Sequence, residues 1–270
     1  MKRLLCFIIS VLFFCSCEEF TFQIENINDD KIQVLGHGGM GIHSILPMNS
    51  LESVAKCIEE GAHGTELDVQ LTKDGFLVAY HDKYLAESTC GSGLIRNSNW
   101  EDLSNVNYTD YAIFSNYKLR LVSDIVEPYK EYVFSFDCKL YTDEEEVSSY
   151  YETFSESLSL LIESNNLSCF IESQNVEFLS LCKQKSPSST LLYYPDNFNE
   201  GLDKVLENDF HGLSISTENV TAKEVETAHG FGLWVSLWNV HTKSRNKDAI
   251  KKSPDCIQAD RLGNLLNLLD

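Results

Sequence analysis

Residues 64–78 have the sequence GTELDVQLTKDGFLV. Apolar and polar residues alternate on both sides of Asp74-Gly75, as they do in two strands connected by a tight turn. The connection is too short for a helical crossover, so the two strands are expected to be antiparallel. The chain is therefore predicted to contain a β-hairpin at this position.

The pairing within this hairpin determines which polar side chains share a face. If Asp74 and Gly75 are the two turn residues, cross-strand pairing places Asp68 opposite His81. Glu66 lies two residues before Asp68, and the two-residue period of a strand puts both carboxylates on one face. His81 is then expected on that same face, beside Asp68.

Around the hairpin, short β-rich runs alternate with longer helical patterns. Besides the return strand of the hairpin, the predicted strands are residues 32–35, 64–71, 132–138, 168–172, 190–194, 212–215, 232–237 and 256–259. The predicted helices are residues 50–60, with Asn49 or Ser50 as N-cap, and residues 122–129, 144–163, 176–184, 199–208, 221–229 and 245–251.

Eight strands in a parallel series are the number that closes a barrel, and residues 31–270 are long enough for one such domain. An open doubly wound sheet would show the same alternation, but no Gly-rich dinucleotide-binding motif follows the first strand. We therefore predict the α/β class, as a (β/α)₈ TIM barrel with an extra β-hairpin after the second strand. Residues 87–120 show no clear βα pattern and are predicted to form a short insertion.

The N-terminal segment is predicted to direct export. A positively charged start precedes an apolar run at residues 4–14, which is too short to span a bilayer comfortably. Residues 13–19, FFCSCEE, resemble a bacterial lipoprotein cleavage box with the cut before Cys17. We expect a lipoprotein signal peptide at residues 1–16 and a lipidated Cys17 with a polar tether at residues 17–30. An ordinary signal peptide with a chance cysteine is the alternative.

The charge of the chain restricts its partners. It carries 21 Lys and Arg against 41 Asp and Glu, a net charge of −20, which argues against a nucleic-acid partner. Cleavage after residue 16 would remove Lys2 and Arg3 and no acidic residue, lowering the net charge to −22. Such a protein is repelled by anionic lipid, so only acyl chains on Cys17 would hold it at a membrane.

Six further cysteines follow Cys17: Cys57, Cys90, Cys138, Cys169, Cys182 and Cys256. An even number in an exported chain permits disulfides, and six cysteines allow 15 connectivities. They lie in apolar or helical contexts without close pairs. Buried free thiols are therefore the expectation.

Three carboxylates are expected to converge at the carboxyl ends of the strands, where a barrel carries its functional groups. Glu66 and Asp68 lie on one strand and Asp137 on the next. They would repel each other unless a cation lay between them, and ligation by oxygen alone favours Ca²⁺ or Mg²⁺. The alternative is that Glu66 and Asp68 are outward residues of a half-exposed strand.

Two histidines and a lysine accompany these carboxylates. His37 follows the first strand, and His37 and His81 could act as acid and base near neutral pH. Lys139 and a bound cation could hold the non-bridging oxygens of a phosphodiester. Lys139 could also simply neutralise Asp137. Trp238, at a later strand end, could form a substrate-facing wall or pack within the barrel.

Several motifs resemble those of the glycerophosphodiester phosphodiesterase family, whose members are phospholipase C-like phosphodiesterase TIM barrels. The matching motifs are HGG at 37–39, PMNSLES at 47–53, GAHGTELDVQLTKDG at 61–75, HD at 81–82, FDCK at 136–139, ES at 172–173, WNV at 238–240 and DR at 260–261. The block from Glu66 to Asp82 is the specific part. The resemblance implies cleavage of glycerophosphodiesters to glycerol 3-phosphate and an alcohol, usually with a divalent cation.

The resemblance also implies roles for individual residues. It places the metal ligands at Glu66, Asp68 and Asp137, the catalytic histidine pair at His37 and His81, and the active-site lysine at Lys139. It further implies that the insertion at residues 87–120 shapes the substrate pocket, and its shortness predicts an open mouth.

This chain departs from the family pattern at two of its motif positions. Gly38 stands where the family usually has an Arg that clamps phosphate. Loss of such a donor costs on the order of 2.7 to 4 kcal/mol of transition-state stabilisation. Asp137 stands where the family more often has Glu, and one methylene less changes the position or grip of the metal.

The sequence therefore predicts a metal-dependent phosphodiesterase for small glycerophosphodiesters that uses His37 and His81 as acid and base. The attacking group would be water or a neighbouring hydroxyl of the substrate. One alternative is a non-catalytic ligand-binding lipoprotein on the same barrel, motivated by Gly38; another is a phosphodiesterase or phospholipase for a different phosphodiester. The protein is expected to be exported and lipid-anchored to a bacterial envelope membrane, in the periplasm or at the cell surface.

Overall fold

The computed structural model describes residues 22–109, 117–141 and 147–270. The predicted signal peptide and Cys17 lie outside the described residues, as does part of the predicted insertion. Within the described residues, no helix combines the length and apolar character that a membrane span requires.

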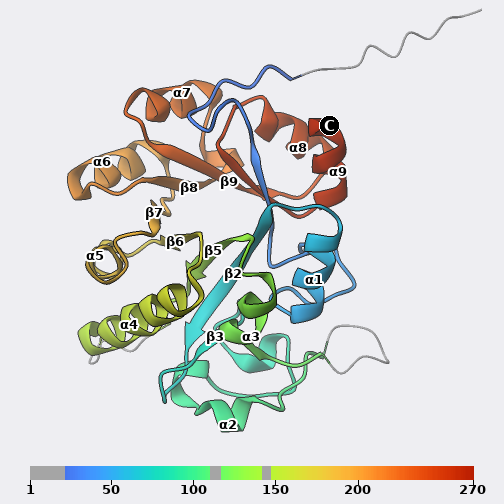
Figure 1. Cartoon of the computed structure of the whole chain (residues 1–270), viewed down its shortest axis with the longest axis vertical. Helices are drawn as coiled ribbons and strands as arrows, with labels where there is room; N and C mark the ends of the chain where they lie inside the picture. The colour runs from blue at the N-terminus through green and yellow to red at the C-terminus, as the bar shows by residue number, and fades with distance from the viewer. Residues whose placement is uncertain (1–21, 110–116, 142–146) are drawn as a thin grey trace, which may run out of the picture.

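Eight parallel strands form a closed barrel with helices around it (Figure 1). The barrel strands are β1 (Gln33–Gly36), β2 (Gly64–Leu71), β5 (Val133–Cys138), β6 (Cys169–Ser173), β7 (Thr190–Tyr193), β8 (Gly212–Ser216), β9 (Trp234–Val240) and β10 (Cys256–Ala259). They follow the order β1-β10-β9-β8-β7-β6-β5-β2, and β1 pairs with β2 to close the barrel. The predicted TIM barrel is confirmed.

The helices that the structure describes follow the predicted alternation. They are α1 (Leu51–Glu59), α2 (Trp100–Leu103), α3 (Val122–Val126), α4 (Val147–Asn165), α5 (Val176–Lys185), α6 (Phe198–Asn208), α7 (Ala222–Gly230), α8 (Lys243–Ile250) and α9 (Leu262–Leu269). Ser50 is the N-cap of α1, and its side chain accepts a hydrogen bond from the amide of Ser53. The prediction of a helix at residues 144–163 begins outside the described residues, and α2 and α9 were not predicted.

The hairpin forms, but the predicted turn is wrong. β3 (Leu77–Ala79) pairs with β2 so that Leu71 faces Leu77, and the amide of Thr72 donates to the carbonyl of Phe76 at 2.9 Å. The loop thus has three residues and ends at Gly75, whose φ of +86° is left-handed. Compared with the predicted two-residue turn, the third loop residue shifts the pairing of β3 with β2 by one residue.

Because of this shift, Tyr80 rather than His81 lies opposite Asp68. The amide of Tyr80 donates to the carbonyl of Asp68 at 3.0 Å. The predicted pairing of Asp68 with His81 is therefore wrong. His81 follows one residue later, beyond the end of β3, and its side chain is about half exposed.

The predicted insertion packs beside the hairpin. The insertion ends with β4 (Arg120–Leu121), which pairs antiparallel with β3. Buried residues of the insertion and of the hairpin region form a second hydrophobic cluster: Val78, Tyr80, Leu85, Ile95, Leu103, Tyr108 and Leu119. The described part of the insertion is therefore an ordered subdomain joined to the edge of β3.

Residues 22–30, which were expected to belong to the tether, pack on the barrel. Phe22 and Ile24 lie against the core. The amide of Ile27 donates to Oδ1 of Asp255 at 3.1 Å, and Nδ2 of Asn26 donates to the carbonyl of Pro254 at 2.8 Å. These contacts fix the segment next to the start of β10, so residues 22–30 belong to the folded domain.

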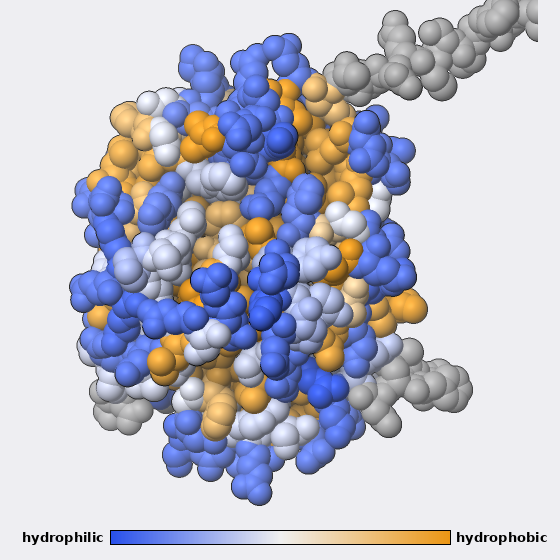
Figure 2. Space-filling model, in the orientation of Figure 1, coloured by the Kyte–Doolittle hydropathy of each residue, from blue (hydrophilic) through white to orange (hydrophobic). Residues whose placement is uncertain are grey.

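The surface and the thiols fit the composition. Hydrophilic residues predominate on the face shown in Figure 2, with hydrophobic residues in patches between them. The six cysteines of the described residues are free thiols. Cys90 is exposed and the other five are buried, so the expectation of buried thiols holds for all but Cys90.

Candidate active site

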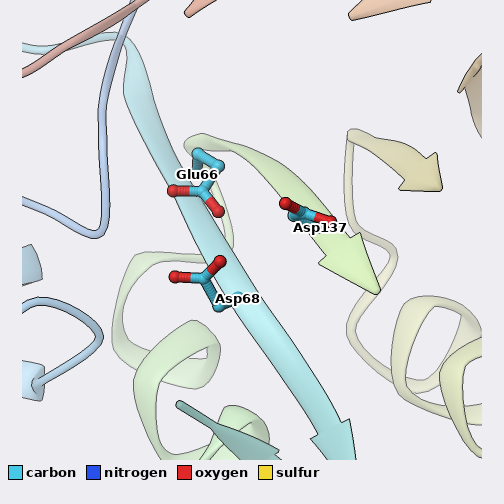
Figure 3. Close-up of side chains that lie close together, drawn as sticks. All are labelled: Glu66, Asp68 and Asp137. Atoms are coloured by element: carbon cyan, nitrogen blue, oxygen red, sulfur yellow. The ribbon is translucent and has the colours of Figure 1, made fainter. Parts of the chain in front are cut away.

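Three carboxylates meet at the carboxyl ends of neighbouring strands. Glu66 and Asp68 project from β2, and Asp137 projects from β5 (Figure 3). Asp68 and Asp137 are register partners, and one oxygen from each of the three side chains lies within 4.8 Å of the others. Strand period and parallel register together place these side chains on one face, as the sequence predicted.

Glu66 is held by the turn that follows β1. The amide of Gly38 donates to Oε2 of Glu66 at 2.9 Å, and the amide of Gly39 donates to Oγ1 of Thr65 at 2.9 Å. Gly38 has a φ of +54°, and a Cβ there would lie 2.8 Å from Cβ of Met48. Glycine is therefore required both by the left-handed backbone and by the close approach of Met48.

Asn49 fixes Asp68, and sequence analysis missed this role. Nδ2 of Asn49 donates to Oδ2 of Asp68 at 2.7 Å, and the amide of Asp68 donates to Oδ1 of Asn49 at 2.9 Å. Asn49 is left-handed, with a φ of +64°, and 1% exposed. Its position beside Ser50 made it a candidate N-cap, and the sequence pattern could not distinguish a helix cap from a hydrogen-bond partner of Asp68.

Lys139 bridges two of the three carboxylates. Its Nζ lies 3.0 Å from Oδ1 of Asp68 and 2.7 Å from Oδ2 of Asp137. These two charges hold the pKa of Lys139 well above its usual value, although burial opposes them. Lys139 is thus cationic and lies within the site, where the sequence placed it.

Burial and mutual repulsion set the protonation of the carboxylates. Burial raises the pKa of Glu66 well above its usual value, and the charge of Asp68 adds to this effect. Burial also raises the pKa of Asp137, against the opposing effect of Lys139. At Asp68, burial is outweighed by the charges of Lys139 and the two histidines, so its pKa is lowered. Burial and repulsion thus favour protonation of Glu66 and Asp137, whereas Lys139 keeps Asp68 ionised.

His37 is oriented by a carboxylate from the last strand. Nδ1 of His37 lies 2.9 Å from Oδ1 of Asp260, and its Nε2 lies 4.0 Å from Oε2 of Glu66. Burial lowers the pKa of His37, but the hydrogen bond to Asp260 and the charges of Glu66 and Asp260 raise it to about 9. Asp260 thus holds the ring with Nε2 facing the carboxylates.

Asp260 also holds a second histidine, which sequence analysis left without a partner. Oδ2 of Asp260 lies 2.6 Å from Nδ1 of His241, and Oδ1 accepts the amide of Ile42 at 3.1 Å. Asp260 is 2% exposed. The sequence places Asp260 and His241 just after two adjacent strands, but this position alone does not indicate which residue either one contacts.

His81 lies on the loop after β3 and is held by its own neighbour. Its Nδ1 lies 2.8 Å from Oδ1 of Asp82, and the hydroxyl of Ser88 fixes Oδ2 of Asp82 at 2.5 Å. His37 and His81 line one cavity of about 180 Å³, together with Tyr108 of the insertion. The structure thus brings both histidines to one cavity, and the insertion does shape it.

Trp238 contacts a residue that lines a second cavity. Its ring packs on Tyr194, with 5.0 Å between ring centroids. Tyr194 lines a second cavity with Asp137 and Lys139. Trp238 therefore supports the wall of this cavity through Tyr194. Its indole nitrogen is buried without a hydrogen-bond partner among the described residues.

Glu172 is a fourth buried carboxyl group next to the cluster. It is the register partner of Asp137 on β6 and is 1% exposed. The hydroxyl of Ser135 and Nε2 of Gln258 both donate to it, the latter at 2.6 Å. Burial, helped by the charge of Asp137, raises the pKa of Glu172 to about 7. Both hydrogen bonds go to Oε1, within the barrel interior.

The carboxylate cluster fits a hard divalent cation. Its three ligand atoms are all oxygens, they lie close together, and Glu66 and Asp68 are buried while Asp137 is partly buried. Glu66 in particular is a buried carboxylate whose nearest basic side-chain atom is the imidazole Nε2 at 4.0 Å. A cation bound by these oxygens would offset the repulsion among the three carboxylates.

Comparison with known proteins shows the family of the chain. Residues 40–264 match the model of the glycerophosphoryl diester phosphodiesterase family. The chain is 26% identical over 247 residues to the glycerophosphodiester phosphodiesterase of Caldanaerobacter subterraneus, which covers 88% of this chain and 98% of that protein. It is 36% identical over 89 residues to the YqiK protein of Bacillus subtilis, a match that spans 32% of this chain and about a third of that protein.

Solved structures share the same fold. A phosphodiesterase from Oleispira antarctica, in complex with the product sn-glycerol-3-phosphate, superposes with a TM-score of 0.78 at 19% identity. That superposition covers 88% of this chain and 96% of the other. Because the family model spans most of the chain, from the loop after β1 to α9, the protein belongs to the glycerophosphoryl diester phosphodiesterase family.

Proposed function

We propose that this protein hydrolyses glycerophosphodiesters to sn-glycerol 3-phosphate and an alcohol. The observation that carries the proposal is one cavity lined by His37 and His81, beside the buried carboxylates Glu66 and Asp68 and the partly buried Asp137. The family to which the chain belongs and the product held by the Oleispira phosphodiesterase support the same substrate class.

The proposed reaction divides the proton transfers between the two histidines. An oxygen of water, or a neighbouring hydroxyl of the substrate whose cyclic product water then opens, attacks phosphorus, and the bond from phosphorus to the leaving alcohol oxygen breaks. One histidine takes the proton of the attacking oxygen and the other gives a proton to the leaving alcohol. Asp260 holds His37 with Nε2 facing the site, and Asp82 holds His81 in the same way through Nδ1.

Lys139 and a divalent cation would neutralise the phosphate. We infer that Glu66, Asp68 and Asp137 hold Ca²⁺ or Mg²⁺. Such a cation, when bound, would stabilise the charge that develops on the phosphate oxygens. Lys139, already in contact with two of these carboxylates, would hold a non-bridging oxygen.

The test is release of sn-glycerol 3-phosphate from a panel of soluble glycerophosphodiesters, with Ca²⁺, Mg²⁺ or EDTA. We expect turnover that requires metal and falls by at least about 100-fold in His81→Ala, the usual contribution of a general acid or base. Tyr84→Ala, which removes a similarly exposed side chain on the same loop, is the matched control and should retain activity. If folded, metal-binding protein turns over none of the headgroups, the alternative of a non-catalytic ligand-binding barrel would be favoured instead.

We also propose that the protein is exported and anchored to a bacterial envelope membrane through acyl chains on Cys17. The lipoprotein-like sequence around Cys17 supports this. The high negative charge gives the chain no electrostatic attraction to anionic lipid, so the acyl chains alone would hold it there. In cells, Cys17→Ser should move the protein from the membrane fraction to the soluble fraction, while Cys90→Ser should not. Membrane retention of Cys17→Ser would rule the anchor out.

A further inference from the structure

The segment that precedes β1 is fixed to one end of the barrel. The amide of Glu25 donates to Oγ of Ser253 at 3.2 Å, and the amide of Ile27 donates to Oδ1 of Asp255 at 3.1 Å. Ser253 and Asp255 lie just before β10, so they mark the end of the barrel at which its strands begin. Residues 22–30 therefore join the domain at the end opposite to the active site, which lies where the strands finish.

Asp255 makes this attachment firm. Its side chain is fully buried, and besides Ile27 it binds two further groups. Oδ2 of Asp255 accepts the amide of Val235 on β9 at 2.8 Å and lies 3.0 Å from Nε2 of His229 on α7. Phe22 adds a contact with the hydrophobic core. The position of Phe22 at this end of the barrel is therefore set by several elements together.

The connection between Phe22 and the proposed lipid anchor is short. Phe22 lies five positions after Cys17 in the sequence. In any conformation, this much chain spans at most about 18 Å. Acyl chains on Cys17 would hold that residue at the lipid surface. Phe22, and with it the end of the barrel to which it is fixed, would then lie within about the same 18 Å of a bilayer.

The barrel is taller than this connection is long. The mouth of the barrel is the end at which its strands finish, and α4 leads from there back to the start of β6. The length of α4 therefore approximates the height of the barrel. Its 19 residues rise by about 28 Å. For the mouth to meet a bilayer, the connection between Cys17 and Phe22 would have to extend along this whole height, and it is too short.

Apolar side chains are exposed at both ends of the barrel. At the end where the strands begin, Ile27 is 43% exposed, Phe231 at the end of α7 is 58% exposed and Tyr132 before β5 is 37% exposed. Such side chains can enter the headgroup region of a bilayer. At the mouth, Ile42 is 44% exposed and Ile45 is 80% exposed. Apolar surface alone thus selects neither end, whereas the short connection to Cys17 selects the end where the strands begin.

We propose that the end of the barrel at which the strands begin faces a lipid bilayer, and that the active site opens away from this bilayer. The inference rests on the acylation of Cys17 that is part of the proposed function. Ile27 and Phe231 then lie toward the lipid headgroups, whereas Ile42 and Ile45 lie toward solvent. The anchored protein takes its substrate from solution and not from the membrane that holds it.

Quenching of a fluorescent dye by lipids that carry a nitroxide on the headgroup tests this orientation. The full chain is expressed with its export signal, so that acylation blocks the thiol of Cys17, and Cys90→Ser removes the exposed thiol. The dye is attached to a new cysteine, made by Phe231→Cys or by Ile45→Cys. In phosphatidylcholine vesicles we expect quenching of the dye at position 231 and none at position 45. Equal or stronger quenching at position 45 would overturn the inference.

The same measurement separates failure of the orientation from failure of the anchor. With Cys17→Ser added, neither dye should be quenched, because nothing holds the protein at the vesicle. If the protein with Cys17 intact does not bind vesicles, the anchor fails and the orientation fails with it. If it binds and the dye at position 45 is quenched, the anchor stands and the orientation alone is refuted. Neither reading depends on hydrolysis, so both are independent of the proposed activity.

The orientation also has a consequence for activity. An active site tethered so that it faces a bilayer should cleave a phosphodiester lipid of that bilayer at least about 100-fold faster than the untethered protein does, since tethering raises the effective concentration. The proposed orientation predicts no such gain when acylated protein and Cys17→Ser are compared on the same vesicles. Both forms should cleave a soluble glycerophosphodiester at equal rates. A gain of this size on the lipid alone would overturn the inference and leave the proposed hydrolysis intact.

Discussion

At the scale of single residues, Asp260 determines the state of His37. A histidine whose pKa in the folded protein is raised to about 9 contributes stability that is complete below its unfolded pKa, near 6.5. That contribution is lost as the pH rises through 9. The free energy of unfolding of the metal-free protein should therefore fall between pH 7 and pH 9.

Replacing Asp260 tests this coupling. Asp260→Asn removes the carboxylate from Nδ1 of His37, so the pKa of His37 should fall toward 6.5 and the loss of stability between pH 7 and pH 9 should shrink. NMR titration of His37 in metal-free protein, with chemical denaturation at both pH values, measures the two effects. Asp82→Asn, which alters the partner of His81 instead, is the control and should leave the pKa of His37 in place. A pKa of His37 that does not respond to Asp260→Asn would mean that Glu66 alone sets it.

Gly38 gives a second prediction at this scale. Gly38→Ala places a Cβ 2.8 Å from Met48 in a left-handed backbone, so it should lower the free energy of unfolding by about 1–3 kcal/mol. Denaturant titration measures the change. The matched control is Gly230→Ala in α7, where a Cβ meets no atom within 4 Å and the backbone is not left-handed; this change should be neutral or stabilising. Gly38→Arg meets the same contacts with Met48, so it should not simply raise activity.

At the scale of elements, the hairpin shows why turn length controls the register of a strand. Gly75 ends a three-residue loop with a φ of +86°, in open space. Gly75→Ala should therefore destabilise the protein by about 1–2 kcal/mol through backbone strain alone, and Gly75→Asn by less, because Asn tolerates this conformation. Denaturant titration compares the two variants. Equal stability of both would mean that the loop can change its conformation without cost.

The same element marks what the sequence could predict. The strands were predictable because each is a short apolar run, and the carboxylates were predictable because two-residue periodicity and parallel register are local rules. The turn was not, because Asp-Gly fits both a two-residue and a three-residue loop. Because the loop is one residue longer than predicted, Tyr80 and not His81 lies opposite Asp68.

Contacts between side chains that meet only when the barrel closes could not be predicted from the sequence either. Asp260 contacts His37 only because the last strand pairs with the first, across 223 positions of the chain. Asn49 was found, but as a candidate cap rather than as the partner of Asp68. Patterns within one element predict which face a residue occupies, whereas contacts between distant elements depend on the whole packed barrel.

At the scale of the whole molecule, charge links the fold to its proposed metal. The chain has a net charge of −20, and the three clustered carboxylates add local repulsion that Lys139 relieves for two of them. Any cation will screen the first effect, but only a cation bound at the cluster will relieve the second. The two effects can be separated by ionic strength and by a single substitution.

Calcium or magnesium added to metal-free protein should raise its melting temperature, at an ionic strength held constant with NaCl. A ligand at 100 times its Kd stabilises the native state by about 2.7 kcal/mol, which is several degrees for a chain of this size. Asp137→Asn weakens the cluster and should abolish most of the rise, whereas Glu226→Gln, an exposed carboxylate on α7, should retain it. If both variants keep the full rise, the cation acts by general screening of an acidic protein, and the carboxylate cluster is held together by Lys139 alone.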